Sequence, residues 1–490
     1  YPMKPRLAIS MSIIVMLFGS CADNKEAMVT TQTLITRPNI ILFVADDHGT
    51  DALGSYGNNV IKTPHLDQLA TEGVRFNNAY CTTASCAASR SVILTGLFGH
   101  ATGSYGHVHD YHHFSTYDKV KSLPVLLEKE GYATARIGKY HVAPESVYHF
   151  QEELKANPRN TVEMAEECKD VLASEKPFFL YFCTDDPHRA ASTNPGQWDA
   201  PNSFGNKVDG YAGVETITYD PEEVIVPDFL PDTKESREEI AQYYQSVSRI
   251  DQGFGRLMQM LKESGKADNT IVIYISDNGM AFPGAKTTLY EPGMKLPCII
   301  KDPFSKLKNT TSDAMISWVD LTPTILDMAK VEIKENSFHG RSFKDVLNVK
   351  EPEGWDQIYA SHTFHEITMY YPMRVVRDKN YKLIRNIAWR LEYPFASDLW
   401  AASTWQEVHR NQKEFYGKRK VQDYLFHPEF ELFDLEEDPD EILNLANDPD
   451  YKEVVDEMIK KMKAFQIQTR DPWLITWDHD DSLQGTGVNL

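Results

Sequence analysis

Residues 81–96 read Cys-Thr-Thr-Ala-Ser-Cys-Ala-Ala-Ser-Arg-Ser-Val-Ile-Leu-Thr-Gly, a small polar loop that runs into a helix. Residues 87–91 favour a first helical turn, the aliphatic run 92–94 is expected to be buried, and Gly96 is a natural helix end. Cys86 therefore lies at a helix N-terminus, where unpaired N–H groups attract an anion. Arg90 follows one turn later on the same side. A nucleophile beside a guanidinium predicts a site for a tetrahedral oxyanion, such as phosphate or sulfate.

Acidic side chains follow two of the predicted buried strands. The apolar run 39–45 is typical of a parallel-sheet strand and ends at Asp46 and Asp47. A second such strand ends at Asp277 and Asn278. Open α/β sheets place their sites at the carboxyl ends of strands, so the second pair can complete a site begun by the first. The hard oxygen atoms suit calcium or magnesium, whereas an exposed turn is the alternative for an isolated Asp-Asp pair.

Cations and histidines follow other predicted strands. Lys139 and His141 alternate after one strand, so both can face one side. A cation beside a histidine can bind an oxyanion and move a proton, although a solvated strand end is the simpler alternative. His188 follows a second buried strand, and Lys286 lies in a loop bounded by glycine and proline. These residues are candidates for the positive charge that an anion site needs.

Four histidines lie within seven positions of the segment 103–114, namely His107, His109, His112 and His113. Such a density suggests either a metal cluster or a loop that faces substrate. The segment has no cysteine and no regular i,i+4 pairing of histidines. We therefore favour the substrate-facing loop.

The order of apolar and polar segments predicts an α/β protein. Residues 37–345 are expected to form a large, mostly parallel sheet flanked by helices. The composition turns polar near 336–353, and residues 346–490 are expected to form a smaller α+β subdomain with an antiparallel sheet. The strands predicted for the first part are 39–45, 133–137, 177–183 and 270–275, with helices at 161–173 and 235–264. Those predicted for the second part are 357–361, 373–377, 381–386 and 430–435, with a helix at 452–468.

The chain of 490 residues carries a formal net charge of −21, which argues against binding to nucleic acid. Hydrophobic residues at 42% and charged residues at 25% are typical of a folded enzyme with an ample core. Six cysteines at irregular spacing form neither a zinc cluster nor a dense disulfide frame. An enzyme of this charge that acts on anions needs local positive charge at its site.

The first 36 residues are read as a targeting segment. A short basic region, 3–6, precedes an apolar run, 7–18, that is too short to span a bilayer. The run ends in Leu17-Phe18-Gly19-Ser20-Cys21, which looks like a bacterial lipobox. We expect residues 1–21 to be a lipoprotein signal peptide with the lipid on Cys21, and residues 22–36 to be a tether. The protein would then be exported and anchored to a bacterial cell membrane, facing the periplasm or the cell surface.

Five segments together resemble the type I sulfatase family. They are Asp46-Asp47, the Cys86 motif with Ser89-Arg90 and Leu94-Thr95-Gly96, Gly138-Lys139-Tyr140-His141, Asp277-Asn278-Gly279, and 430–435 with Asp438-Pro439. The resemblance implies an alkaline-phosphatase-like fold. It also implies that Cys86 is oxidised to formylglycine, an aldehyde that hydrates to a geminal diol and attacks sulfur. Ala88 stands where the family has proline; some sulfatase-maturating enzymes of the radical type accept alanine there, whereas the oxygen-dependent ones generally want proline, and the sequence leaves the route of maturation open.

The resemblance also assigns roles within the site. Calcium would be bound by Asp46, Asp47, Asp277 and Asn278 together with the modified Cys86. The sulfate would be held by Arg90, Lys139 and Lys286. His141 would assist collapse of the sulfated diol, and His188 would protonate the leaving group.

Within the family, residues 110–114, 117–124, 186–189 and 365–374 are similar to the N-sulfoglucosamine sulfohydrolase (sulfamidase) subgroup. This implies an exo-acting pocket for the terminal sugar of a sulfated polysaccharide or oligosaccharide. Bacterial relatives of the subgroup also act on O-sulfates of algal polysaccharides such as ulvan, which is the alternative substrate. The substrate-binding residues would be His107, His109, His112, His113, Arg189, His365, Glu366 and Arg374.

Two rival functions follow from the same residues. A phosphatase or phosphonate-ester hydrolase of the same superfamily would use Thr or Ser with two zinc ions, and too few metal-binding histidines follow the strands here. If Cys86 were never oxidised, the protein would bind a sulfated glycan without cleaving it. The full set of cations and acids argues against such a loss of activity.

Overall fold

The computed structural model describes residues 37–190 and 200–479, which form one compact unit. The predicted signal peptide and tether, residues 1–36, lie outside the described residues. No helix within the described ranges is long and apolar enough to cross a membrane. The site residues named above all lie within this unit.

An eight-stranded mixed sheet forms the centre of the first part, in the order β4-β3-β5-β1-β6-β7-β2-β8. Only β7 among these strands runs antiparallel to its neighbours, so the predicted, mostly parallel sheet is confirmed. The strands are β1 (Asn39–Ala45), β2 (Val74–Tyr80), β3 (Ala133–Gly138), β4 (Glu152–Leu154), β5 (Phe178–Cys183), β6 (Thr270–Ser276), β7 (Cys298–Lys301) and β8 (Thr310–Ser317).

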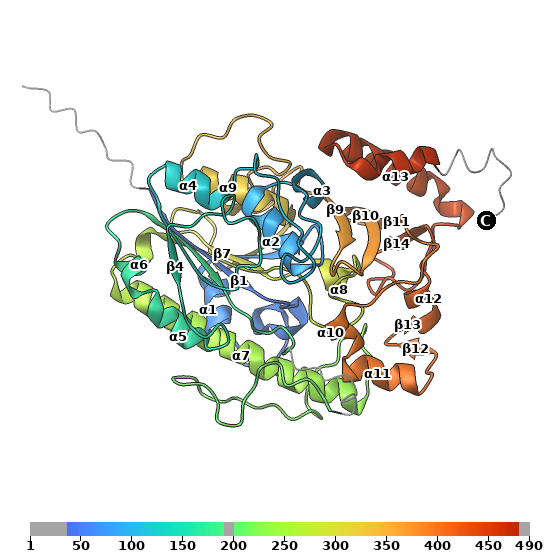
Figure 1. Cartoon of the computed structure of the whole chain (residues 1–490), viewed down its shortest axis with the longest axis horizontal. Helices are drawn as coiled ribbons and strands as arrows, with labels where there is room; N and C mark the ends of the chain where they lie inside the picture. The colour runs from blue at the N-terminus through green and yellow to red at the C-terminus, as the bar shows by residue number, and fades with distance from the viewer. Residues whose placement is uncertain (1–36, 191–199, 480–490) are drawn as a thin grey trace, which may run out of the picture. The chain divides into compact units, whose positions relative to one another are not determined.

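Helices cover both faces of this sheet (Figure 1). Alternate residues of β1 feed two separate cores: Ile41 and Phe43 face one, and Leu42 and Val44 face the other. The first core is covered by α1 (Pro64–Glu72), α5 (Thr161–Glu167), α6 (Lys169–Ala173) and α7 (Lys234–Glu263). The other is covered by α2 (Cys86–Thr95), α4 (Leu123–Lys129) and α9 (Leu321–Met328), with the short α3 (Gly99–Thr102) and α8 (Glu291–Met294) nearby. The helix predicted at 161–173 is in fact two helices, because the chain turns at Cys168.

A second, four-stranded antiparallel sheet follows, in the order β14-β11-β10-β9. Its strands are β9 (Gln357–Phe364), β10 (Tyr370–Asp378), β11 (Tyr381–Asn386) and β14 (Phe430–Asp434). Around it lie α10 (Ser397–Trp400), α11 (Ser403–Arg410), the hairpin β12 (Phe415–Tyr416) and β13 (Arg419–Lys420), α12 (Val421–Leu425) and α13 (Lys452–Thr469). The predicted α+β part with an antiparallel sheet is confirmed. The predicted boundary at 345/346 falls inside the short 3₁₀ helix Lys344–Asn348.

Candidate active site

The side chain of Cys86 occupies the first position of α2, directly after the N-cap residue Ser85. All ten residues of α2 are buried, and the helix ends at Gly96, whose φ of 65° is the left-handed conformation that glycine adopts readily. Burial raises the pKa of the Cys86 thiol to about 12, although Lys139 and Lys286 oppose this shift. The encoded thiol is therefore protonated at neutral pH and a weak nucleophile.

The predicted oxygen ligands meet at the carboxyl ends of β1 and β6. Asn278 Nδ2 donates to Asp47 Oδ1 (2.7 Å), and the Asp47 backbone N–H donates to Asp277 Oδ1 (3.0 Å). The side chains of Asp46, Asp47, Asp277 and Asn278 are all buried. One oxygen each of Asp46 and Asn278 has no hydrogen-bond partner. Burial raises the pKa of Asp277 to about 7 against the opposing charge of Arg90.

These residues fit a divalent cation. Carboxylate and amide oxygens are the ligands that calcium prefers, and a cation would relieve the orphaned oxygens and the crowded negative charge. Ligand-capable atoms of Asp46, Asp47 and Cys86 lie within 4.8 Å of one another. Residue 86 therefore lies against the same group, as the resemblance implies.

Three cations surround the acidic group. Arg90 Nη2 lies 2.9 Å from Asp277 Oδ2 and 3.6 Å from Asp46 Oδ1. Lys139 Nζ lies 2.6 Å from Asp46 Oδ2. Burial disfavours the lysine charge, but the Asp46 carboxylate outweighs it and raises the pKa of Lys139. Arg90 and Lys139 are both charged at neutral pH and can hold an oxyanion against the N-terminus of α2.

Lys286 and His188 both contact a different acid of the group, Asp47. Lys286 Nζ lies 2.9 Å from Asp47 Oδ2, and His188 Nε2 lies 3.7 Å from the same oxygen. His188 Nδ1 is bonded to the Arg189 carbonyl oxygen (2.7 Å) and so donates its proton there. A proton that His188 gains or gives up must therefore be carried on Nε2, the atom that faces the site.

Asp398 is a site residue that the sequence did not reveal. Its Oδ2 lies 3.1 Å from Lys286 Nζ and 3.8 Å from His188 Nε2. Burial disfavours its charge, but Lys286 and then His188 outweigh this and hold the pKa of Asp398 well below its usual range. Asp398 lies in α10, so the C-terminal part of the chain contributes a carboxylate to the catalytic centre.

Four histidines gather beside Cys86. His107 Nε2 lies 3.1 Å from His365 Nε2, and His109 Nδ1 lies 2.8 Å from His141 Nε2. A ring nitrogen each of His107 and His141 lies within 4.8 Å of the Cys86 sulfur. Burial, with a smaller contribution from Lys286, lowers the pKa of His107 to about 2. The predicted loop does approach Cys86, and His107 presents a neutral ring there.

The remaining predicted substrate residues are His112, His113 and Glu366, and two arginines whose side chains are paired with acids. His112 Nδ1 accepts from the Ile367 backbone (3.0 Å), Glu366 Oε1 accepts from the Ser397 backbone N–H and hydroxyl, and His113 is exposed. Arg189 and Arg374 occupy structural positions. Both guanidiniums are buried in bidentate pairs, Arg189 with Glu239 and Arg374 with Asp471, so a substrate contact by either is not supported.

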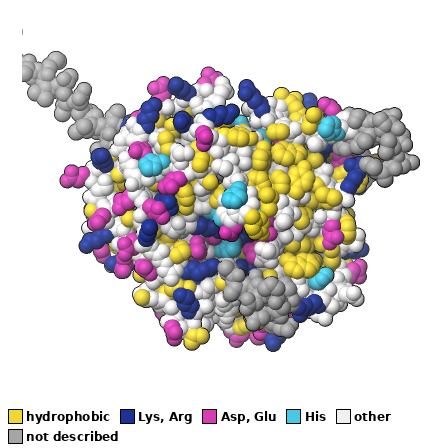
Figure 2. Space-filling model, viewed as in Figure 1, with side chains coloured by type: hydrophobic (Ala, Val, Ile, Leu, Met, Phe, Trp, Pro, Cys, Tyr) yellow, Lys and Arg dark blue, Asp and Glu magenta, His cyan; other side chains and the backbone are white. Residues whose placement is uncertain are grey.

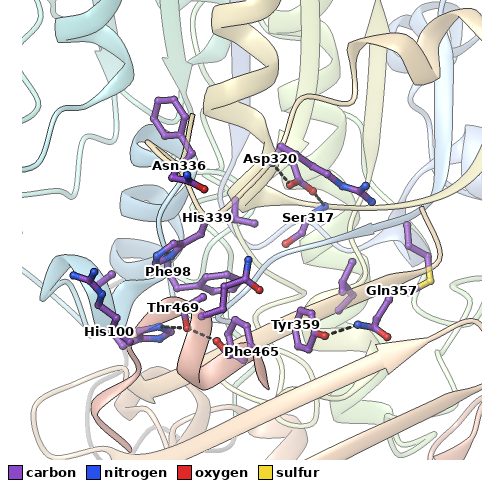
Figure 3. Close-up of a pocket in the computed structure, with 18 of the residues that line it drawn as sticks. Phe98, His100, Ser317, Asp320, Asn336, His339, Gln357, Tyr359, Phe465 and Thr469 are labelled. Carbon is purple, nitrogen blue, oxygen red and sulfur yellow. Dashed lines mark hydrogen bonds between the residues drawn. The ribbon is translucent and has the colours of Figure 1, made fainter. Parts of the chain in front are cut away.

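A separate cleft of about 1070 Å³ lies beyond the C-terminal end of α2 (Figure 3). The His339 backbone donates to the Gly96 carbonyl there (2.9 Å), and Phe465 and Tyr359 stack against each other in its wall. One of its two histidines, His100, is already bonded to Ser361 and Thr469. None of the residues that line this cleft belongs to the group around Cys86. On the face drawn in Figure 2, by contrast, histidine and charged side chains gather in a central hollow beside a hydrophobic area.

The sequence matches two family models. The first, described as sulfatase, covers residues 38–331, and the second, the C-terminal part of N-sulphoglucosamine sulphohydrolase, covers residues 284–395. Human N-sulphoglucosamine sulphohydrolase is 34% identical over 462 residues, which are 90% of this chain and 92% of that protein. An ulvan-active sulfatase of Formosa agariphila is 28% identical, with 90% and 82% covered.

Solved structures share the fold. One, a complex with D-glucosamine-2-N,6-O-disulfate, matches with a TM-score of 0.64 at 23% identity and covers 89% of this chain and 99% of that one. The phosphonate monoester hydrolase of Agrobacterium radiobacter matches with a TM-score of 0.63 at 20% identity, with 88% and 96% covered. The predicted alkaline-phosphatase-like fold is confirmed. The chain belongs to the sulfatase family, the hydrolases of sulfate esters and sulfamates.

Proposed function

We propose that this sulfatase acts at the end of a sulfated glycan and removes sulfate from the nitrogen of a terminal N-sulfoglucosamine. The observation that carries this substrate is the match to human N-sulphoglucosamine sulphohydrolase, which extends over 90% of the chain. The match of residues 284–395 to the C-terminal part of that enzyme supports it further. These residues include Lys286, His365 and Glu366, which lie at or beside the site.

The chain's own residues divide the work of sulfate transfer. Arg90, Lys139 and Lys286 bind the sulfuryl oxygens and neutralise the charge that grows on them in the transition state. His188 carries a proton on Nε2 for the leaving atom, since its Nδ1 is held by the Arg189 carbonyl. His141 lies beside residue 86 and can accept a proton there.

Two further groups complete the proposal. Formylglycine derived from Cys86 would supply the oxygen nucleophile, and calcium held by Asp46, Asp47, Asp277 and Asn278 would supply positive charge. The weakly nucleophilic thiol of Cys86 and the orphaned oxygens of Asp46 and Asn278 support both assignments. Because Ala88 replaces the usual proline, we assign maturation to a radical-type sulfatase-maturating enzyme. We also propose export and a lipid anchor on Cys21, from the basic and apolar pattern of residues 3–21.

A second candidate is an O-sulfatase that acts on an algal polysaccharide. The 28% identity to an ulvan-active sulfatase over 90% of the chain favours it. The same cations would bind the sulfate in either case. The two candidates differ in the leaving group, which is an amine in one and an alcohol in the other.

Free-sulfate release from paired substrates tests the proposal. Protein matured with a radical-type activator is offered a heparan disaccharide with terminal N-sulfoglucosamine and, separately, ulvan oligosaccharides. We expect release from the heparan sugar. Release from ulvan alone would move the substrate to O-sulfate esters and leave the family assignment unchanged.

A further inference from the structure

The Asp398 carboxylate lies beside His188, the proposed proton donor to the leaving group. Its Oδ2 lies 3.8 Å from His188 Nε2, the atom that carries the transferable proton. The Asp398 side chain is 19% exposed, whereas those of Asp46 and Asp47 are at most 1% exposed. Asp398 can therefore be reached from the substrate side, unlike the acids that would hold the metal.

A carboxylate at this position is unexpected in a site built for an anion. Sulfate is bound best by cations, and Asp398 would repel it. The single positive charge of Lys286 is partly neutralised by Asp398 Oδ2, which lies 3.1 Å from Nζ. A group that weakens sulfate binding in this way has a reason to be present if positive charge appears elsewhere on the substrate.

Cleavage of a sulfamate produces such a charge. When the S–N bond breaks, the sulfuryl group passes to the nucleophile at position 86 and the bonding electron pair stays on nitrogen. The nitrogen, which already carries carbon and hydrogen, takes the proton from His188 Nε2 and is cationic while the bond to sulfur is still partly formed. With the one proton from His188 the nitrogen leaves as a neutral amine, which then takes a second proton from water and becomes an ammonium ion at neutral pH. In an ester, the oxygen takes one proton and leaves as a neutral hydroxyl.

We propose that Asp398 is the residue that selects an amine over an alcohol as leaving group, by stabilising the positive charge on the sulfamate nitrogen. This rests on the proposed sulfamate activity. The placement of the carboxylate supports it. Glu366 Oε1 accepts hydrogen bonds from the Ser397 backbone N–H (2.8 Å) and hydroxyl (2.6 Å) and so fixes the start of α10 next to Asp398. Glu366 is then a positioning residue rather than a substrate ligand.

The test compares Asp398→Asn, Asp398→Glu and unchanged protein, all full-length and fully matured. Substrates are a disaccharide with terminal N-sulfoglucosamine and an aryl sulfate. We expect Asp398→Asn to lower kcat/KM on the sulfamate by about 100-fold or more and on the aryl sulfate by less than about 5-fold, because a buried preorganised charge is worth this much. Asp398→Glu should restore part of the sulfamate activity. Asp356→Asn, an exposed acid in the C-terminal part, is the matched control and should change neither rate.

Two results would overturn the assignment while leaving the proposed function in place. Equal losses on both substrates would mean that Asp398 only holds Lys286. A higher calcium requirement in Asp398→Asn would make Asp398 a metal ligand with Asp47 and His188, whose ligand atoms lie within 4.8 Å of it. Failure of the unchanged protein to cleave the sulfamate would overturn the proposed function instead. Should the Asn variant not fold, the ratio of the two rates in Asp398→Ala, which also removes the carboxylate, gives the same comparison.

Discussion

Arg90 Nη2 lies 2.9 Å from Asp277 Oδ2, and Arg90 Nε lies 3.0 Å from the same oxygen. The guanidinium of Arg90, on α2, thus binds the Asp277 carboxylate that follows β6. Its Nη1 also donates to the Lys139 carbonyl (3.2 Å). One side chain of α2 therefore joins the ends of β6 and β3 and fixes Lys139 relative to residue 86.

Replacement of Arg90 by lysine should lower kcat/KM by about 100-fold, since the charge stays but the planar fork that joins Asp277 and Lys139 is lost. Steady-state sulfate release measures this effect. Arg256→Lys, a partly exposed arginine of α7 paired with Glu166, is the matched control and should retain full activity. Activity of Arg90→Lys within twofold of the unchanged protein would show that catalysis does not depend on the guanidinium.

Calcium removal should abolish activity and lower the melting temperature, because a ligand that binds only the folded state stabilises it. Titration of calcium into chelated protein, read by activity and by thermal unfolding, measures both effects. Asn278→Ala removes one ligand oxygen and should shift both curves to higher calcium. Asn411→Ala, an exposed residue bonded to Glu407, is the control. A chelated protein with unchanged activity and stability would contradict the metal assignment.

His188→Ala should reduce hydrolysis of substrates with poor leaving groups much more than hydrolysis of activated aryl sulfates. An activated aryl oxide leaves without protonation, whereas an amine or alkoxide needs the proton on Nε2. The ratio of kcat/KM on the two substrates is the measurement. Equal losses on both would exclude His188 as the acid.

Arg374 and Asp471 should act through stability rather than substrate binding. Burial opposes the Asp471 charge, but hydrogen bonds and charge from Arg374 outweigh it and lower the pKa of Asp471 to about 2. The ionised pair therefore stabilises the fold above about pH 4, and about 2 kcal/mol of this stability is lost as the pH falls toward 2.

Asp471→Asn should cost about 3–5 kcal/mol of unfolding free energy at pH 7 and leave KM unchanged. Its stability should also lose the acid-dependent component, which denaturant unfolding at pH 7 and pH 3 measures. Arg374→Lys should also lower the unfolding free energy at pH 7. The losses from the two substitutions should not add in the double variant. A raised KM at unchanged stability in Arg374→Lys would restore it as a substrate residue.

The catalytic motifs could be predicted because each follows a strand with a strong local signal. Residues 40–45 are all apolar and the whole of 39–45 is buried, so β1 was predicted with its observed bounds. The four oxygen ligands follow such strands, and Lys139 follows β3, which is only partly buried. β2 was not predicted, because its sequence VRFNNAY mixes polar and apolar side chains and is only partly buried. β7 has four residues and gives too short a signal.

Partners that are far apart in the sequence could not be predicted in this way. His107 and His365 are 258 positions apart, and only the packing of β9 against the catalytic part brings them together. Asp398 lies in a four-residue helix with no periodicity to mark it. Arg189 and Arg374 match the family's sequence style, but a sequence does not show that Glu239 and Asp471 already occupy their guanidiniums.

The most direct test of the account is sulfate release from a disaccharide with terminal N-sulfoglucosamine, by protein in which mass spectrometry shows the Cys86 peptide to be converted. Cys86→Ala, treated in the same way and shown by circular dichroism to be folded, is the control. The account predicts stoichiometric release of sulfate and glucosamine by the converted protein and none by the variant. Substantial release by Cys86→Ala, or none by fully converted protein, would contradict it.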